Sequence, residues 1–308
     1  MPAPSRECLN RNTCVGYSAP YMTIPIIDRA GPLLGRYRIL FCDIWGVVHD
    51  GVTAYPGAND ALPRFRAAGG IVVLVSNAPR PGPSVARLLD EKSVSREAWD
   101  AIVSSGDIAL RHIAEIGYKR LYRIGPERRD SAFFEGLPGP HTPIEDADAI
   151  VCTGLDRDRQ DQPEVYLPLL EQALARRLPF VCANPDLAVH VGDDLLPCAG
   201  AVAALYEERG GPVFWAGKPH RVAYQTALER AAELTGGPVD RATVLAIGDA
   251  VRTDLAAAAG AGVDALLIAG GLHRDELMTD GAIDRARLAE VLAPPAPQPV
   301  AAMVQLAW

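Results

Sequence analysis

Three apolar runs of the sequence each end in a polar side chain that could do chemistry: Asp43, Ser76 and Asp249. A fourth segment supplies Lys218. If the runs are neighbouring parallel strands, all four groups meet at the carboxyl edge of the sheet, where open α/β folds bind ligands. Two carboxylates there suit Mg²⁺, which takes few protein oxygens together with substrate phosphate. A lysine and a hydroxyl beside them would bind the remaining phosphate oxygens.

Each of these residues also has an ordinary structural explanation when it is taken alone. Asp43 could cap a turn after its strand, because Asp is common there, and Asp249 could be a helix N-cap. Ser76 could end a strand in the same way, and Lys218 could be a solvated lysine. Only the four together, in this order, favour a phosphate site.

The elements that must position these residues follow a βα rhythm. Continuous apolar runs such as 71–75 are typical of strands buried on both faces of a parallel sheet. We expect strands over residues 38–43, 71–75, 101–104, 121–124, 149–152, 180–183, 213–215, 243–247 and 265–268. We expect helices over residues 56–68, 82–90, 107–116, 163–177, 199–209, 221–234 and 253–259. Prolines 294, 295 and 297 are expected to end the fold.

Composition excludes several classes of function. The net charge of -8 argues against nucleic-acid binding, which needs clustered Lys and Arg. No sustained apolar stretch indicates a secretory signal or a membrane span. The six cysteines include no CxxC pair, and four of them lie in apolar runs, as buried free thiols do. We therefore expect a cytoplasmic protein.

Four motifs, taken in order, resemble the haloacid dehalogenase superfamily of phosphohydrolases. They are Asp43-Ile44-Trp45-Gly46-Val47, Val75-Ser76-Asn77, Gly217-Lys218-Pro219 and Gly248-Asp249-Ala250-Val251-Arg252-Thr253-Asp254. The Gly-Lys-Pro segment, Asn184-Pro185-Asp186 and the long insert after Ser76 are similar to the NagD-like branch, class IIA.

The resemblance implies a fold and a set of domains. The fold class is α/β, a doubly wound, Rossmann-like parallel sheet core with an inserted α/β cap domain. The expected catalytic core covers 36–83 and 212–285, with the cap at 84–211. Residues 1–35 would be an N-terminal extension and 286–308 a C-terminal tail. Closure of the cap would exclude water and select the substrate.

The resemblance also implies roles for the residues around the metal. Asp43 would be the nucleophile that forms an aspartyl-phosphate. Its other oxygen, the backbone carbonyl of Trp45 and the carboxylate of Asp249 would hold Mg²⁺. Asp254 would support the metal shell through water or orient the lysine.

On the phosphate side, the resemblance implies that Ser76 hydrogen-bonds the transferred group and that Lys218 neutralises its charge. Asn77, Asn184 and Asp186 would contact the substrate, although a turn explains the last two nearly as well.

Trp45 departs from the pattern of the family, which usually has a general acid and base Asp at this position. An indole cannot donate and retake a proton near neutral pH, and such help is typically worth about 10²–10⁴-fold. Three outcomes stay open: a substrate with a good leaving group, a substitute acid such as His49 or Asp50, or a slow second step.

The leading expectation is a Mg²⁺-dependent phosphatase of a small phosphorylated metabolite, a sugar phosphate or similar. The alternatives are a phosphotransferase and, because of Trp45, a non-catalytic phosphometabolite-binding protein. The sequence leaves open whether the chain forms a homodimer.

Overall fold

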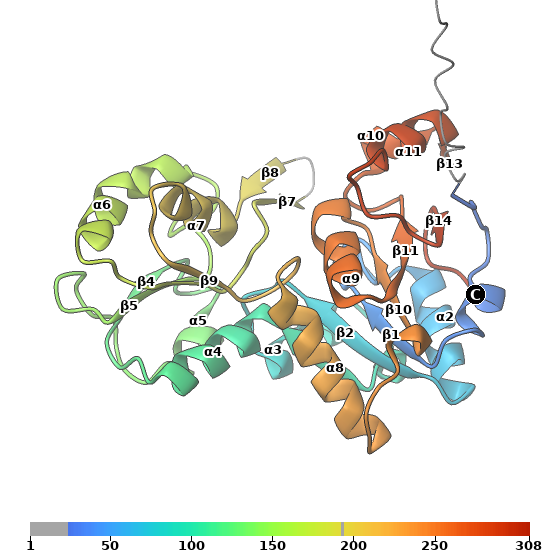
Figure 1. Cartoon of the computed structure of the whole chain (residues 1–308), viewed down its shortest axis with the longest axis horizontal. Coiled ribbons are helices and arrows are strands. Elements are labelled where there is room, and N and C mark those ends of the chain that lie inside the picture. The colour runs from blue at the N-terminus through green and yellow to red at the C-terminus, as the bar shows by residue number, and fades with distance from the viewer. Residues whose placement is uncertain (1–23, 192–193) are drawn as a thin grey trace, which may run out of the picture.

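The computed structural model describes residues 24–191 and 194–308, which form two lobes, each built on a parallel sheet (Figure 1). The larger sheet has six strands, in the order β14-β11-β10-β1-β2-β3, and every neighbouring pair is parallel. Its strands are β1 (Ile39–Cys42), β2 (Ile71–Ser76), β3 (Ala101–Ser104), β10 (Val244–Gly248), β11 (Asp264–Ile268) and β14 (Ala301–Met303).

The central strand β1 explains why this sheet forms. All four of its residues are buried, and they alternate between two apolar clusters. Leu40 and Cys42 face α2 (Pro56–Ala67) and α3 (Gly82–Glu91). Ile39 and Phe41 face the other side, where α4 (Ser105–Ile116), α8 (Arg221–Thr235) and α9 (Ala256–Ala261) contribute to the cluster. Helices therefore cover both faces, which confirms the doubly wound α/β core.

The second lobe is the inserted cap, a four-stranded parallel sheet in the order β4-β5-β6-β9. Its strands are β4 (Leu121–Ile124), β5 (Ala149–Cys152), β6 (Phe180–Cys182) and β9 (Val213–Trp215). Helices α6 (Leu167–Ala175) and α7 (Ala199–Glu208) pack on one face, and α4 and the short α5 (Ser131–Phe134) belong to the cluster on the other. The antiparallel hairpin β7–β8 (Ala188–Val191 and Asp194–Pro197) extends from this lobe towards the core lobe (Figure 1).

The two sheets divide the chain at other residues than we expected. Strand β3 pairs with β2 in the core sheet, although we expected 84–211 to be cap. Strand β9 pairs with β6 in the cap sheet, although we expected 212–285 to be core. An apolar run of three or four residues carries no information about its partner, so the tertiary structure decides which sheet it joins.

The two ends of the described chain also belong to the core, which corrects the expectation of a tail at 286–308. Strand β14 forms the edge of the six-stranded sheet, and Ile26 bridges to Ala302 in it. Leu306 is buried, and the indole of Trp308 lies against Gly31 in α1 (Gly31–Leu34). Of the expected N-terminal extension, residues 1–23 lie outside the described part of the chain.

The remaining elements lie near the core and on the cap. Helices α10 (Arg274–Leu277) and α11 (Arg285–Val291) flank a small hairpin, β12–β13 (Met278–Thr279 and Ala282–Ile283). The helix expected at 163–177 begins as a 3₁₀ turn, Pro163–Tyr166, and the one expected at 253–259 begins as a π-helical turn, Val251–Leu255. Among the helices within 24–191 and 194–308, none is both long enough and apolar enough to cross a membrane.

Candidate active site

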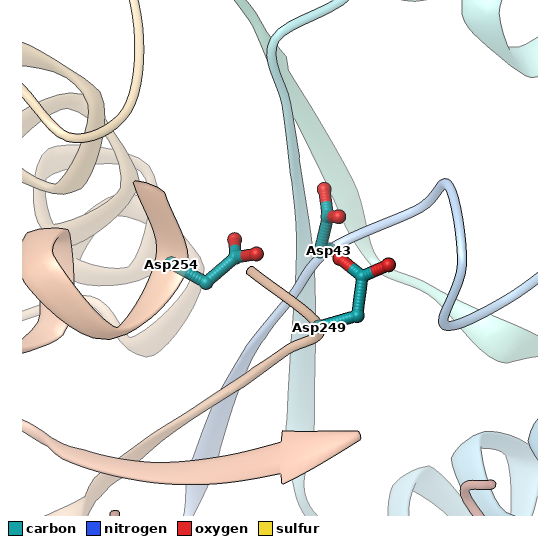
Figure 2. A group of neighbouring side chains, drawn as sticks. All are labelled: Asp43, Asp249 and Asp254. Atoms are coloured by element: carbon teal, nitrogen blue, oxygen red, sulfur yellow. The ribbon is translucent and has the colours of Figure 1, made fainter. Parts of the chain in front are cut away.

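Asp43 and Asp249 lie side by side because they follow neighbouring strands. Cys42 of β1 is in register with Ile247 of β10, and each strand ends within two residues of its aspartate. The backbone N–H of Asp43 donates to Ile247 O at 2.8 Å. Figure 2 shows the two carboxylates close together, with Asp254 pointing towards them from the following helical segment. Carboxylate oxygens of all three residues lie within 4.8 Å of one another.

Two glycines let the backbone close around Asp249. A Cβ on Gly46, which has a φ of +80°, would lie 1.9 Å from Asp249 Oδ2, and one on Gly271 would lie 2.1 Å from it. The N–H of Leu272 donates to the same oxygen at 2.7 Å. We did not expect this contact from the sequence, although the Gly270-Gly271 pair shortly after an expected strand was a signal for close backbone approach.

Lys218 joins the other two carboxylates. Its ammonium lies 2.6 Å from Asp43 Oδ1 and 2.7 Å from Asp254 Oδ1, and the residue is only 2% exposed. The second oxygen of Asp254 accepts the N–H of Ala250 at 3.1 Å. Of the two roles expected for Asp254, this geometry favours orienting the lysine.

The charges of this cluster do not balance. Two buried carboxylates and the half-buried one of Asp43 surround one ammonium, so their full ionisation leaves two uncompensated negative charges. Burial raises the pKa of Asp43 to about 7; Lys218 opposes the rise and Asp254 adds to it. Burial, followed by repulsion from Asp43 and Asp254, raises the pKa of Asp249 well above its usual range. Burial opposes the charge of Lys218, but Asp254 and Asp43 hold its pKa well above the ordinary value.

A divalent cation fits this site by charge and by donor chemistry. Asp249 Oδ1 and the carbonyl oxygen of Trp45 accept no hydrogen bond from any residue that the structure describes, and Lys218 binds only Oδ1 of Asp43. Carboxylate and carbonyl oxygens are the ligands that Mg²⁺ prefers. Asp43 Oδ2, Asp249 Oδ1 and the Trp45 carbonyl would therefore hold the cation, and its charge would compensate the surplus.

Ser76 and Asn77 follow β2 but face different partners. Ser76 is 9% exposed, and its Oγ accepts the N–H of Ala78 at 3.2 Å. Asn77 holds the backbone of Lys218: its Oδ1 accepts the lysine N–H at 2.8 Å, and its Nδ2 donates to the lysine carbonyl at 3.0 Å. The same Nδ2 donates to Asp186 Oδ1 at 2.8 Å. Asn184 Oδ1 accepts the N–H of Asp186 at 3.1 Å, which forms a turn in the cap.

Asn77 therefore connects the carboxyl end of β2 to Lys218 and to Asp186 of the cap. Its loss should destabilise the protein. We expect Asn77→Ala to lower the free energy of unfolding by about 1–3 kcal/mol, because the buried N–H of Lys218 loses its acceptor. Urea unfolding measures this. Asn59→Ala is a matched control, since Asn59 also makes two backbone hydrogen bonds, one of them solvent-exposed and one half-buried. Equal losses in the two variants would contradict the role of Asn77.

Both suggested substitute acids are engaged in local hydrogen bonds. His49 is 1% exposed, its Nδ1 accepts the N–H of Gly51 at 2.9 Å, and burial lowers its pKa to about 4. Asp50 Oδ1 accepts the N–H groups of Val52 and Thr53 at 2.8 and 2.7 Å, and these bonds lower its pKa. The indole of Trp45 meets the His49 ring edge to face, with centroids 5.3 Å apart.

Comparisons with known proteins find related sequences and folds. The sequence model of the haloacid dehalogenase-like hydrolases matches residues 40–135, and a related model matches 215–295. The chain is similar to 5'-nucleotidase YutF of Bacillus subtilis (strain 168), with 27% identity over 79% of this chain and 91% of that protein. It also matches dihydroxyacetone phosphatase of Corynebacterium glutamicum (strain R), with 34% identity over 31% of this chain. That match spans only 33% of the phosphatase.

Solved structures extend the likeness to nearly the whole chain. A haloacid dehalogenase-like hydrolase from Brucella suis 1330 is 41% identical, with a TM-score of 0.79, over 91% of this chain and 100% of that one. NagD from E. coli K-12 shares the fold at 22% identity, with a TM-score of 0.63 over 88% of this chain and 97% of its own.

Proposed function

The chain belongs to the haloacid dehalogenase-like hydrolases, and on that basis we propose that it is a Mg²⁺-dependent phosphatase of a small phosphorylated metabolite. The observation that carries the proposal is the buried surplus of negative charge around Lys218 at the carboxyl edge of the sheet. Relatives named as a phosphatase and a 5'-nucleotidase support a phosphoric monoester as the substrate. The four described free thiols, which are buried, support a cytoplasmic location.

The mechanism assigns the nucleophile to Asp43. Its carboxylate oxygen attacks phosphorus, the bond from phosphorus to the leaving oxygen breaks, and the electron pair departs with that oxygen. Water then attacks the phosphorus of the aspartyl-phosphate, which releases phosphate and restores Asp43. Bound Mg²⁺ would supply positive charge to the phosphoryl oxygens.

The other side chains of the site position and neutralise charge. Lys218 compensates Asp43 and the phosphoryl group, and Asp254 holds the lysine in place. The hydroxyl of Ser76 donates to a phosphoryl oxygen. Phosphoryl transfer depends mainly on this kind of positioning and electrostatic stabilisation.

The test is release of phosphate from 4-nitrophenyl phosphate by the full chain with Mg²⁺, and its loss with EDTA. Release that requires an added alcohol or other acceptor would indicate a phosphotransferase. Binding of phosphorylated compounds with no release would indicate a binding protein. Release that EDTA leaves unchanged would contradict the metal site.

Asp249→Asn should weaken Mg²⁺ binding while keeping the side-chain shape and the oxygen that accepts from Leu272. Loss of a group that only supports a metal ligand typically lowers metal affinity by about 10–100-fold. We expect the apparent affinity for Mg²⁺ to fall by at least that much. Mg²⁺ titration of activity and calorimetry measure this. Asp50→Asn, the same change on a neighbouring exposed turn, serves as the control. An unchanged affinity in Asp249→Asn would remove Asp249 from the metal site.

A further inference from the structure

We infer that this site acts on phosphorylated substrates whose leaving group departs as a stable anion, namely aryl, enol or acyl phosphates, and that the indole of Trp45 binds the planar leaving group. The inference rests on the proposed phosphatase function and narrows its substrate class. It follows from the hydrogen-bond partners of the lysine, histidine and aspartate side chains around Asp43, and from the exposed surface of Trp45.

The basic groups at the site are already engaged in interactions with other residues. Lys218 makes two buried ion pairs, and giving up its proton would leave both carboxylates without a cation. The ring of His49 is buried, with Nδ1 accepting from Gly51 and one edge against Trp45. A doubly paired ammonium and a buried imidazole are therefore poorly suited to protonate a departing oxygen and then recover the proton.

The acidic groups are held as hydrogen-bond acceptors. Asp249 accepts from Leu272, Asp254 accepts from Lys218 and Ala250, and Asp50 accepts from two backbone N–H groups. Asp186 is the remaining candidate, because burial raises its pKa. Its Oδ1 accepts from Asn77 Nδ2, which also donates to the carbonyl of Lys218, so Asp186 too is engaged as a hydrogen-bond acceptor.

The side chain of Trp45 offers a binding surface at the position where a proton donor for the leaving group would be expected. The side chain packs on Gly51, where a Cβ would lie 2.6 Å from the ring, yet the residue remains 36% exposed. The adjacent Gly46 packs on Asp249, so the backbone of Trp45 lies beside the metal site. Leu272, whose N–H binds Asp249, is also exposed at 44% and adds apolar surface.

The chemical step balances without a proton donor. The bond from Asp43 oxygen to phosphorus forms, and the bond from phosphorus to the leaving oxygen breaks. The electron pair stays on a phenolate, an enolate or a carboxylate, each of which is stable in water. An alkoxide is a much poorer leaving group and would need the proton that this site does not supply. Such help is worth about 10²–10⁴-fold, so the site should discriminate strongly against alkyl phosphates.

The experiment measures kcat/KM for a series of substituted phenyl phosphates and for glycerol phosphate, with Mg²⁺ and the full chain. We expect kcat/KM to fall steeply as the pKa of the leaving phenol rises. The alkyl ester should lie at least about 10²-fold below 4-nitrophenyl phosphate. Trp45→Asp, which restores a carboxyl group, should flatten the slope and raise the rate with glycerol phosphate. Trp45→Phe, which restores none, should keep the steep slope and raise KM for the aryl esters.

Three results would overturn the inference. The first is a shallow slope in the unaltered protein. The second is a Trp45→Asp slope as steep as that of Trp45→Phe. The third is a slope that steepens in Asp186→Asn, which would make Asp186 the proton donor. Failure of the whole function looks different, because then no member of the series would release phosphate in a Mg²⁺-dependent reaction.

Discussion

Asp43→Asn is expected to lower kcat for phosphate release by about 10³-fold or more, as loss of a covalent nucleophile does in other enzymes. The amide has nearly the shape of the carboxylate but is a far weaker nucleophile, and it carries no charge for Lys218 to pair with. Release of 4-nitrophenol and of inorganic phosphate measures the loss. Thermal unfolding of the same variant tests whether the fold survives. We expect that it does, because the substitution removes one negative charge from a cluster that has a surplus of them.

The covalent intermediate provides an independent check on Asp43. Rapid acid quenching during turnover, followed by peptide mass spectrometry, should find a phosphoryl group on the peptide that contains residue 43. The missing proton donor also slows activation of the attacking water, so the intermediate should accumulate. If Asp43→Asn keeps more than a tenth of the activity, another group is the nucleophile.

Lys218→Met is expected to have the second large effect, on both stability and activity. The substitution preserves most of the length of the side chain but leaves the carboxylates of Asp43 and Asp254 buried without their cation. Breaking a buried ion pair by removing one partner typically costs about 3–5 kcal/mol. We expect a decrease of that order in the free energy of unfolding without Mg²⁺, measured with urea, together with loss of phosphate release.

Two further variants show whether charge is the cause. Lys119→Met removes a lysine from the exposed surface and should change stability by no more than about 0.5 kcal/mol. Lys218→Met combined with Asp254→Asn removes one of the unpaired charges, so it should recover part of the lost stability. If the double variant is less stable than Lys218→Met, the lysine acts by packing and not by charge.

The interactions of Asn77 and Asp254 show how far the sequence can be used to predict a site. From their places in two motifs, Asn77 was expected to contact the substrate, and Asp254 to support the metal shell or to orient the lysine. In the structure their side chains bind Lys218, which is 141 residues from Asn77 and 36 from Asp254. Nothing in the local sequence of either residue encodes such a partner, because a hydrogen bond across the fold depends on rotamers and on the packing of two distant segments.

The sequence by itself determined that Asp43, Ser76 and Asp249 lie at the ends of buried strands. A strand covered on both faces appears in the sequence as a continuous apolar run, and the point where that run ends is visible in the local sequence. Their convergence followed, since parallel strands present their carboxyl ends at one edge. Only the tertiary structure decided that β3 and β14 join the core sheet and β9 the cap, and that Asp254 and Asn77 hold the lysine. These outcomes depend on contacts between segments far apart in the chain, and such contacts form only when the whole chain folds.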